Sequence, residues 1–123
     1  MATSELAAIL RAEAPARIYL PHPEDNHPDH RAALPALRVA LRETGMKAEL
    51  FAYEVWTPLA RAEEIEDITA AMPAKLRAVR CYASQLASFR YDRAVRGLAQ
   101  YRGALFGKCG CAEAFESLEL SPE

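Results

Sequence analysis

The sequence predicts an α/β domain with a short, mostly parallel sheet and flanking helices. Short β-favouring runs at 16–20 and 49–56 alternate along the chain with helical patterns at 4–14 and 32–41. Alternation of this kind is typical of parallel sheets whose strands are joined by helices. A hydrophobic content of 51% and a charged content of 26% fit an ordinary globular core.

The first half of the chain contains the clearest element boundaries. The first β-favouring run is stopped by Pro21 and Pro23, and the apolar helical pattern from Ala32 ends at Gly45, a residue suited to a helix C-cap. Pro28 suits the first turn of that helix, whereas Pro35 is expected to bend it.

The second half is predicted as a short third strand at 65–68 followed by two helices. Thr69 is the expected N-cap of a helix over 75–86. A further helix is expected over 91–106, with Gly107 closing it. At 123 residues one domain is expected, over 1–120, with 121–123 as a frayed tail.

Composition excludes several function classes. Net charge is −2 with both signs interspersed, so no nucleic-acid footprint is indicated. The start of the chain lacks a signal-peptide pattern and no run is long enough for a membrane span, which predicts a cytoplasmic protein. The three cysteines, Cys81, Cys109 and Cys111, are expected to be unpaired thiols.

Arginines are concentrated in the later predicted helices. We interpret them as solvated helix faces, with contact to an anionic substrate or a second subunit as the alternative. They are Arg77, Arg80, Arg90, Arg93, Arg96 and Arg102.

Candidate site chemistry is concentrated between residues 22 and 30. All three histidines, His22, His27 and His30, fall in these nine residues beside Glu24, Asp25 and Asp29. Imidazole and carboxylate groups together are typical of a zinc site and also of general acid–base catalysis. The run follows a predicted strand and precedes a helix, where ligands bind in open α/β sheets. A polar loop that merely caps the helix is the alternative.

The run DNHPDHRA at 25–32 resembles the second signature motif of the LmbE/PIG-L family of zinc-dependent N-deacetylases. The resemblance spans about Ser4 to Leu120. It continues in order through YEVW at 53–56, DIT at 67–69, Lys75, SQ at 84–85, YRG at 101–103 and AEAF at 112–115. It implies a Rossmann-like domain, of which this chain would be a part.

The resemblance also implies roles for individual residues. His30 would be a zinc ligand, and His27 the catalytic histidine that stabilises the oxyanion and protonates the leaving amine. Asp29 would hold and polarise His27. The implied reaction is zinc-dependent hydrolysis of an N-acetyl group on an N-acetylglucosaminyl-type sugar.

Other residues of the region are expected to shape the loop or line the substrate pocket. Asp25 would brace the loop, and His22, between two prolines, would shape or line it. Glu54 and Trp56, at the end of the second predicted strand, are expected to line a pocket, with simple sheet packing as the alternative.

The chain departs from the family in one important respect. The family's opening strand ends in Ala-His-Pro-Asp-Asp-Glu, which supplies two further zinc ligands and the general base, and no such segment is found here. A catalytic zinc usually has three protein ligands. The isolated chain is therefore expected to be a weak or inactive hydrolase. An exposed apolar edge along 18–20 predicts oligomerisation or a complementary front-half chain.

Three hypotheses follow for the function of the chain. It is the carboxy-terminal half of a deacetylase, or a non-catalytic descendant that kept a sugar-binding crevice, or a small α/β interaction module unrelated to that chemistry.

Overall fold

The computed structural model describes residues 2–120 and divides into two compact units. The first unit comprises Met1–Glu63 and Phe115–Glu123, and the second comprises Glu64–Ala114. The tail expected at 121–123 lies outside the described residues.

The first unit contains the alternating elements that the sequence predicts. Two helices and two strands were expected in this order, and both strands and both helices are present. The elements are α1 (Ala2–Glu13), β1 (Arg17–Pro21), the single turn α2 (Pro28–Arg31), α3 (Ala33–Thr44) and β2 (Glu49–Tyr53).

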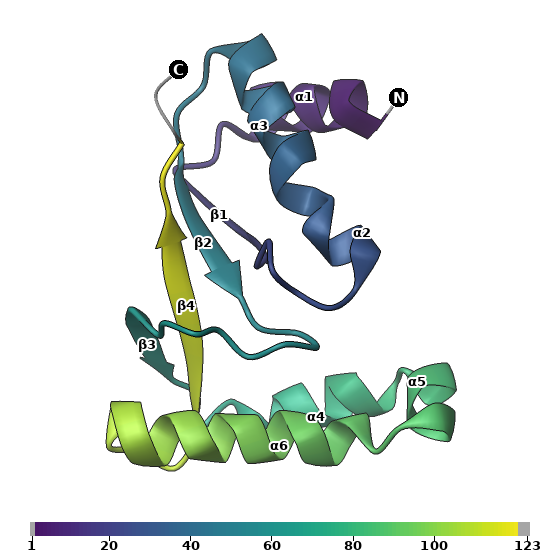
Figure 1. Cartoon of the computed structure of the whole chain (residues 1–123), viewed down its shortest axis with the longest axis vertical. Helices are drawn as coiled ribbons and strands as arrows, with labels where there is room; N and C mark the ends of the chain where they lie inside the picture. Colours follow the sequence, from purple (N-terminus) through teal and green to yellow (C-terminus); the bar gives the residue numbers. More distant parts are fainter. Residues whose placement is uncertain (1, 121–123) are drawn as a thin grey trace. The chain divides into compact units, whose positions relative to one another are not determined.

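The core of the first unit lies between the two longer helices and one face of β1 and β2. Leu20 on β1 and Leu50 on β2 are buried against apolar residues of α1 and α3, and both helices lie on the same side of the strands (Figure 1). The core residues are Ala7, Leu10, Leu20, Leu34, Leu37, Ala40, Leu41 and Leu50. Alternation along the strands leaves Tyr19 and Phe51 on the opposite face.

The predicted boundaries of α3 are confirmed, with one refinement at its start. Gly45 caps the helix in the left-handed conformation, with a φ of 69°. Ala32 separates α2 from α3, so that Pro35 falls in the first turn of α3. Amides of a first turn have no intrahelical acceptor, and the missing N–H of Pro35 therefore costs nothing there.

The second unit is built mainly of helices. Its small core comprises Met72, Leu76, Ala99 and Cys111. Its elements are β3 (Glu64–Asp67), α4 (Met72–Arg80), α5 (Ala83–Ser88), α6 (Tyr91–Arg102) and the π-helical turn η1 (Gly103–Gly107). Within residues 2–120, no helix has the length and apolar character needed to cross a bilayer.

Two predictions for this unit are wrong. The single helix expected over 75–86 is two helices, because Tyr82 adopts a non-helical ψ of 67° and caps α5. Thr69 is not a helix N-cap: its N–H and its hydroxyl both donate to Asp67 Oδ1, at 2.9 and 2.6 Å, and the helix begins only at Met72. A local side-chain turn here replaces the expected cap.

The sheet is mixed rather than mostly parallel, which corrects the expected strand arrangement. Its order is β1-β2-β4-β3, where β4 is Ala112–Leu118. β1 and β2 are parallel, from Arg17 beside Glu49 to Pro21 beside Tyr53, but β4 runs antiparallel to β2. The segment AEAFESL is rich in helix-favouring alanine and glutamate, so propensity gave no strand signal there.

Gly45 provides a test of the cap geometry. Replacing Gly45 by Ala should lower the free energy of unfolding by about 1 kcal/mol, because a Cβ is unfavourable at positive φ. Gly97 in α6 is the matched control, because an added Cβ there also meets open space but φ is not positive. Gly97→Ala should raise stability by up to about 1 kcal/mol. Urea denaturation followed by far-UV circular dichroism measures both, and equal shifts in the same direction would contradict the assignment.

Candidate functional site

The histidine-rich loop lies at the carboxyl ends of β1 and β2. Because these strands are parallel, the loop of residues 22–27 and the loop that begins at Glu54 leave the same edge of the sheet. The backbone N–H of His22 donates to the carbonyl of Tyr53 at 3.1 Å, which extends the strand pairing by one residue. The site therefore occupies the position at which open α/β sheets bind ligands.

The carboxylate of Asp25 connects the two loops and is completely buried. Its Oδ1 accepts hydrogen bonds from the backbone N–H of His27 and from His30 Nδ1, both at 2.9 Å. Its Oδ2 accepts from the backbone N–H groups of Trp56, at 2.9 Å, and Thr57, at 3.1 Å. Both oxygens are thus fully engaged.

These contacts decide the charge state of Asp25. Burial by itself would raise the pKa of this carboxyl group, but the hydrogen bonds from His27, His30, Thr57 and Trp56 outweigh burial and lower the pKa to about 2. Asp25 is therefore an anion at neutral pH and can only accept hydrogen bonds.

The ionised Asp25 fixes the tautomer of His30. Since the carboxylate cannot donate, the 2.9 Å contact requires that His30 Nδ1 carries the proton. The lone pair of His30 then resides on Nε2. A carboxylate that holds the other ring nitrogen is the usual arrangement behind a metal-binding histidine.

His27 has the opposite arrangement of protons. As the N-cap of α2, its Nδ1 accepts the backbone N–H of Asp29 at 3.2 Å. Nδ1 must therefore carry a lone pair, and in the neutral ring the proton is on Nε2. With both rings neutral, His27 can donate a hydrogen bond from Nε2, whereas His30 can only accept one there.

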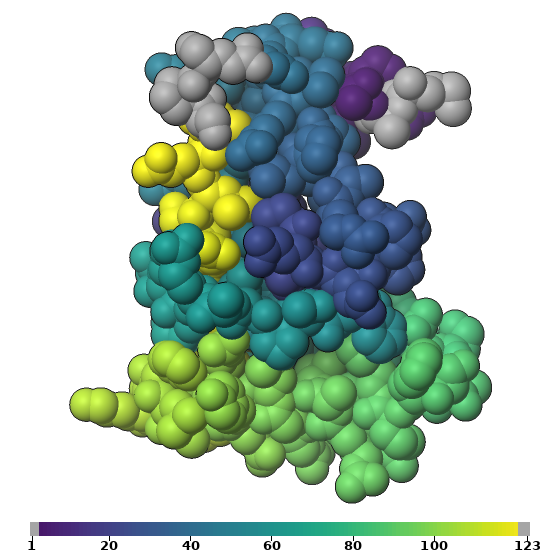
Figure 2. All heavy atoms as spheres, viewed as in Figure 1, coloured from purple at the N-terminus to yellow at the C-terminus, as the bar shows by residue number. Residues whose placement is uncertain are grey.

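The two rings lie side by side. Their centroids are 4.7 Å apart and the planes are inclined by 33°. The His27 side chain is 44% exposed and that of His30 is 25% exposed. Residues 22–31, in dark blue, contribute to the exposed surface beside α3 (Figure 2). The hydrogen-bond donor of His27 and the acceptor of His30 are thus carried by adjacent, solvent-accessible rings.

Asp29 contacts His27 mainly through its backbone. The Asp29 carboxylate lies 4.0 Å from His27 Nδ1, a nitrogen already occupied by the amide of Asp29, and its side chain is 89% exposed. The buried carboxylate that holds an imidazole is that of Asp25, and the imidazole it holds is His30.

The structure adds two residues that sequence reasoning did not single out for the site. Thr57 accepts the Asn26 N–H on its hydroxyl at 2.9 Å, and its carbonyl lies 2.6 Å from His22 Nε2. The Arg31 guanidinium donates to the carbonyls of Asp25 and Asn26, both at 2.9 Å. No local pattern reveals the role of Thr57, because its partners lie about thirty residues away.

His22, Glu54 and Trp56 lie in or beside these loops. His22 is buried and its Nε2 is directed at the Thr57 carbonyl. Glu54 Oε1 accepts the N–H of Leu59 at 2.8 Å, and Trp56 is 36% exposed. A pocket-lining role for these residues remains a prediction.

The residues present do not form a zinc site by themselves. His30 Nε2 is a suitable donor, but His22 Nε2 is engaged with a carbonyl and both Asp25 oxygens accept hydrogen bonds. Across residues 2–120 there is no group of three histidine, cysteine or acidic side chains that could hold a metal. One ligand is too few for a catalytic zinc.

Comparisons with known proteins give structural matches only. Neither the protein-family models nor the curated proteins contain a match to this sequence. The structure resembles a conserved protein from Thermus thermophilus, TT1542, with a TM-score of 0.79 and 27% identity over 99% of this chain. It also resembles the N,N'-diacetylchitobiose deacetylase from Pyrococcus horikoshii, with a TM-score of 0.73 and 22% identity over 98% of this chain.

The chain spans little more than half of each neighbour, 60% of the Thermus protein and 54% of the Pyrococcus enzyme. The chain thus shares a mixed α/β fold with part of each neighbour, and an α/β fold is what the sequence predicts.

Asp25 provides a test of the site. Its pKa is lowered, so the stabilisation it gives is complete above the ordinary pKa near 4 and is lost as pH falls through about 2. Asp25→Asn should lower the unfolding free energy at pH 7 by about 2 kcal/mol and flatten its dependence on acid between pH 4 and 2. Asp29→Asn, in the exposed position, is the control and should change stability by less than about 0.5 kcal/mol. Equal losses in the two variants would contradict the central role of Asp25.

Proposed function

We propose that this chain provides the paired-histidine part of a hydrolytic site that removes N-acetyl groups from acetylated amino sugars. The observation behind the proposal is the pair of adjacent imidazoles, one a donor and one an acceptor, at the carboxyl ends of parallel strands. The resemblance of the DNHPDHRA run to the LmbE/PIG-L motif and the fold likeness to a diacetylchitobiose deacetylase support it.

In this proposal His27 is the group that meets the reacting amide. Its Nε2–H is oriented by the backbone of Asp29 and is accessible from solvent. A positioned N–H donor stabilises the oxyanion that forms when an amide carbonyl is attacked. For His27 to act as the general acid as well, its ring would have to be the imidazolium ion when the C–N bond breaks, because a neutral imidazole that lost its Nε2 proton would become an imidazolate.

His30 would serve as one ligand to a metal that this chain does not hold by itself. Asp25 keeps the proton on Nδ1 and leaves the lone pair on Nε2. The remaining ligands and the base that activates water would have to come from a second polypeptide segment. The family motif His-Pro-Asp-Asp-Glu contains groups of the required kind.

A second function has a specific observation in its favour. Because residues 2–120 contain no three-ligand metal group, a non-catalytic role of the same crevice is the alternative. In that case the two histidines would hydrogen-bond a sugar without hydrolysing it. The two functions differ in whether acetate is released once a complementing segment is supplied.

Zinc content tests the incompleteness of the site. The purified chain should hold well under one zinc per molecule after dialysis, because a single imidazole binds zinc weakly. Elemental analysis and calorimetric titration with zinc measure this. Stoichiometric zinc that is lost in His30→Ala would show that the chain completes its own site.

Activity tests the roles of the two histidines. Acetate release from N,N'-diacetylchitobiose should be at background for the chain alone and should appear when a polypeptide containing the His-Pro-Asp-Asp-Glu strand is added with zinc. In that mixture His27→Ala should lower kcat by about 10²- to 10³-fold, as loss of an oxyanion donor does. Glu24→Gln, in the same loop, is the control. Zinc uptake without acetate release would favour the non-catalytic alternative.

The open face of the first unit is where such a segment is expected to pack. Tyr19 lies 5.8 Å from Phe51 and 5.3 Å from Phe115 between ring centroids, and Tyr19 is 51% exposed. β1 is the edge strand of the sheet, so one side of its backbone has no strand partner among the described residues. Parallel strands are usually covered on both faces.

Association tests this placement. Addition of the complementing polypeptide should protect the β1 amides from hydrogen exchange and shift the sedimentation of the chain. Tyr19→Asp should weaken the complex by about tenfold or more through the loss of buried aromatic area. Glu5→Gln on α1, away from the aromatic face, should leave association unchanged. Equal binding by the Tyr19 variant would contradict the assignment.

A further inference from the structure

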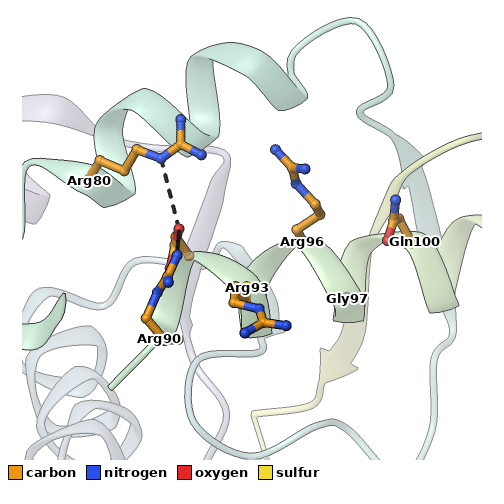
Figure 3. Close-up of a pocket in the computed structure, with 7 residues that line it drawn as sticks. Arg80, Arg90, Arg93, Arg96, Gly97 and Gln100 are labelled. Carbon is orange, nitrogen blue, oxygen red and sulfur yellow. Dashed lines mark hydrogen bonds and ion pairs between the residues drawn. The ribbon is translucent and has the colours of Figure 1, made fainter. Parts of the chain in front are cut away.

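A concavity lies entirely within the second unit and is lined mainly by arginines. It has a volume of roughly 390 Å³, and Figure 3 shows its walls between α4 and α6. The lining residues are Arg80, Arg90, Asp92, Arg93, Arg96, Gly97 and Gln100. Four arginines and one carboxylate thus line the hollow, in a chain whose overall net charge is −2.

The single carboxylate in the lining, that of Asp92, already forms hydrogen bonds with an arginine. Asp92 is 8% exposed and receives two hydrogen bonds from Arg90, Nε to Oδ1 at 3.2 Å and Nη2 to Oδ2 at 3.0 Å. Arg80 Nε is 3.9 Å from Asp92 Oδ2. Asp92 therefore fixes Arg90 and approaches Arg80, and its one charge cannot balance four cations.

Arg93 and Arg96 have no such partner. Within the described residues neither guanidinium makes a hydrogen bond or an ion pair, although both line the same hollow. Figure 3 shows Arg96 and Gln100 extending from α6 into the space that Arg80 approaches from α4. Several donors thus line one hollow, with Arg93 extending on the opposite side of the α6 ribbon from Arg96 in the view of Figure 3.

The position of these arginines on α6 is unfavourable without a counter-ion. α6 begins at Tyr91, and Arg93 lies in its first turn, where the helix dipole disfavours positive charge. Arg93 and Arg96 are also three residues apart, which places like charges side by side. An anion bound in the hollow would relieve both effects.

From this arrangement we infer that the hollow between α4 and α6 is a binding site for a small anion with two or more phosphate groups. Arginine forks pair with phosphate oxygens by two parallel hydrogen bonds. The volume of the hollow is within the range of small-ligand sites. A diphosphate can enter such a hollow, whereas the flat surface of another protein cannot fill it. Gln100 adds a side-chain amide donor at the far end of the row of α6 residues that lines the hollow.

Gly97 is a position from which a new side chain can be directed into the hollow. A Cβ added at Gly97 would meet no atom within 4 Å, so the backbone of α6 borders open space at this point. Because Gly97 also lines the hollow, a large side chain there should occupy part of it. Gly97→Leu therefore blocks the site while all its charges are kept.

Calorimetric titration of the full chain with pyrophosphate at low ionic strength tests the inference. Saturable binding of one pyrophosphate per chain is expected, and it should weaken steeply as salt is added. Arg93→Gln and Arg96→Gln should each weaken binding by about tenfold, as loss of a charge-assisted hydrogen bond does. Gly97→Leu should weaken it by at least about tenfold through exclusion of the ligand, with an unchanged melting temperature or a raised one.

Arg77→Gln is the matched control. Arg77 is an exposed arginine of α4 that does not line the hollow, so its loss should change affinity by less than about twofold. Citrate at the same concentration distinguishes phosphate recognition from general attraction of anions.

Four results would overturn the inference. They are the absence of saturable binding at millimolar pyrophosphate, an equal loss of affinity in Arg77→Gln, equal affinity for citrate, and unchanged affinity in Gly97→Leu. Sedimentation adds a fifth: self-association that Arg96→Gln abolishes while pyrophosphate does not bind would assign the arginines to a second copy of the chain. Should the Gly97 variant fail to fold, the Arg93 and Arg96 variants decide the outcome.

Discussion

The candidate site depends on one buried anion, the carboxylate of Asp25. It has no exposed surface; two of its four hydrogen bonds come from His27 and His30 beside it in the chain, and the other two come from Trp56 and Thr57 in the loop after β2. A buried carboxylate without such partners would be strongly destabilising. Since the partners include backbone N–H groups of both loops, the charge of Asp25 holds the two loops in a single arrangement.

The chemistry of the histidines follows from that arrangement. The ionised Asp25 fixes the proton of His30 on Nδ1, and the first turn of α2 fixes a lone pair on His27 Nδ1. Two identical side chains, 4.7 Å apart between ring centroids, thereby acquire opposite hydrogen-bonding properties at Nε2. In the proposed function, the Nε2–H of His27 would face the amide carbonyl and the Nε2 lone pair of His30 would face a metal.

The two units of the chain differ in what they offer to ligands. The first presents imidazoles at the carboxyl ends of parallel strands, whereas the second presents guanidinium groups between two helices. Helix α6 has two of its three arginines, Arg93 and Arg96, in its early turns, where only Asp92 provides a negative charge. Positive charge in the first turns lowers the stability of the helix. Such a loss is expected at a ligand site, where a bound anion offsets it, rather than on an ordinary solvated face.

The two longer helices and the two parallel strands of the first unit, and the position of the histidines between them, could be predicted from the sequence alone. Pro28, Gly45 and the apolar periodicity act through local geometry, so the helix boundaries follow from neighbouring residues. The likeness of the run at 25–32 to a deacetylase motif could be read in the same way. These signals involve residues close together in the chain, so they can be recognised in a single sequence.

The pairing of a particular carboxylate with a particular imidazole became visible only in the folded chain. Asp25 rather than the Asp29 carboxylate holds an imidazole, because the loop after β2 brings the amides of Trp56 and Thr57 around Asp25. The antiparallel strand β4 was equally hidden, since its alanine and glutamate residues favour a helix and its pairing with β2 is a long-range contact. Contacts between residues far apart in the chain leave no periodic trace in the sequence, and for that reason they appear only in the folded molecule.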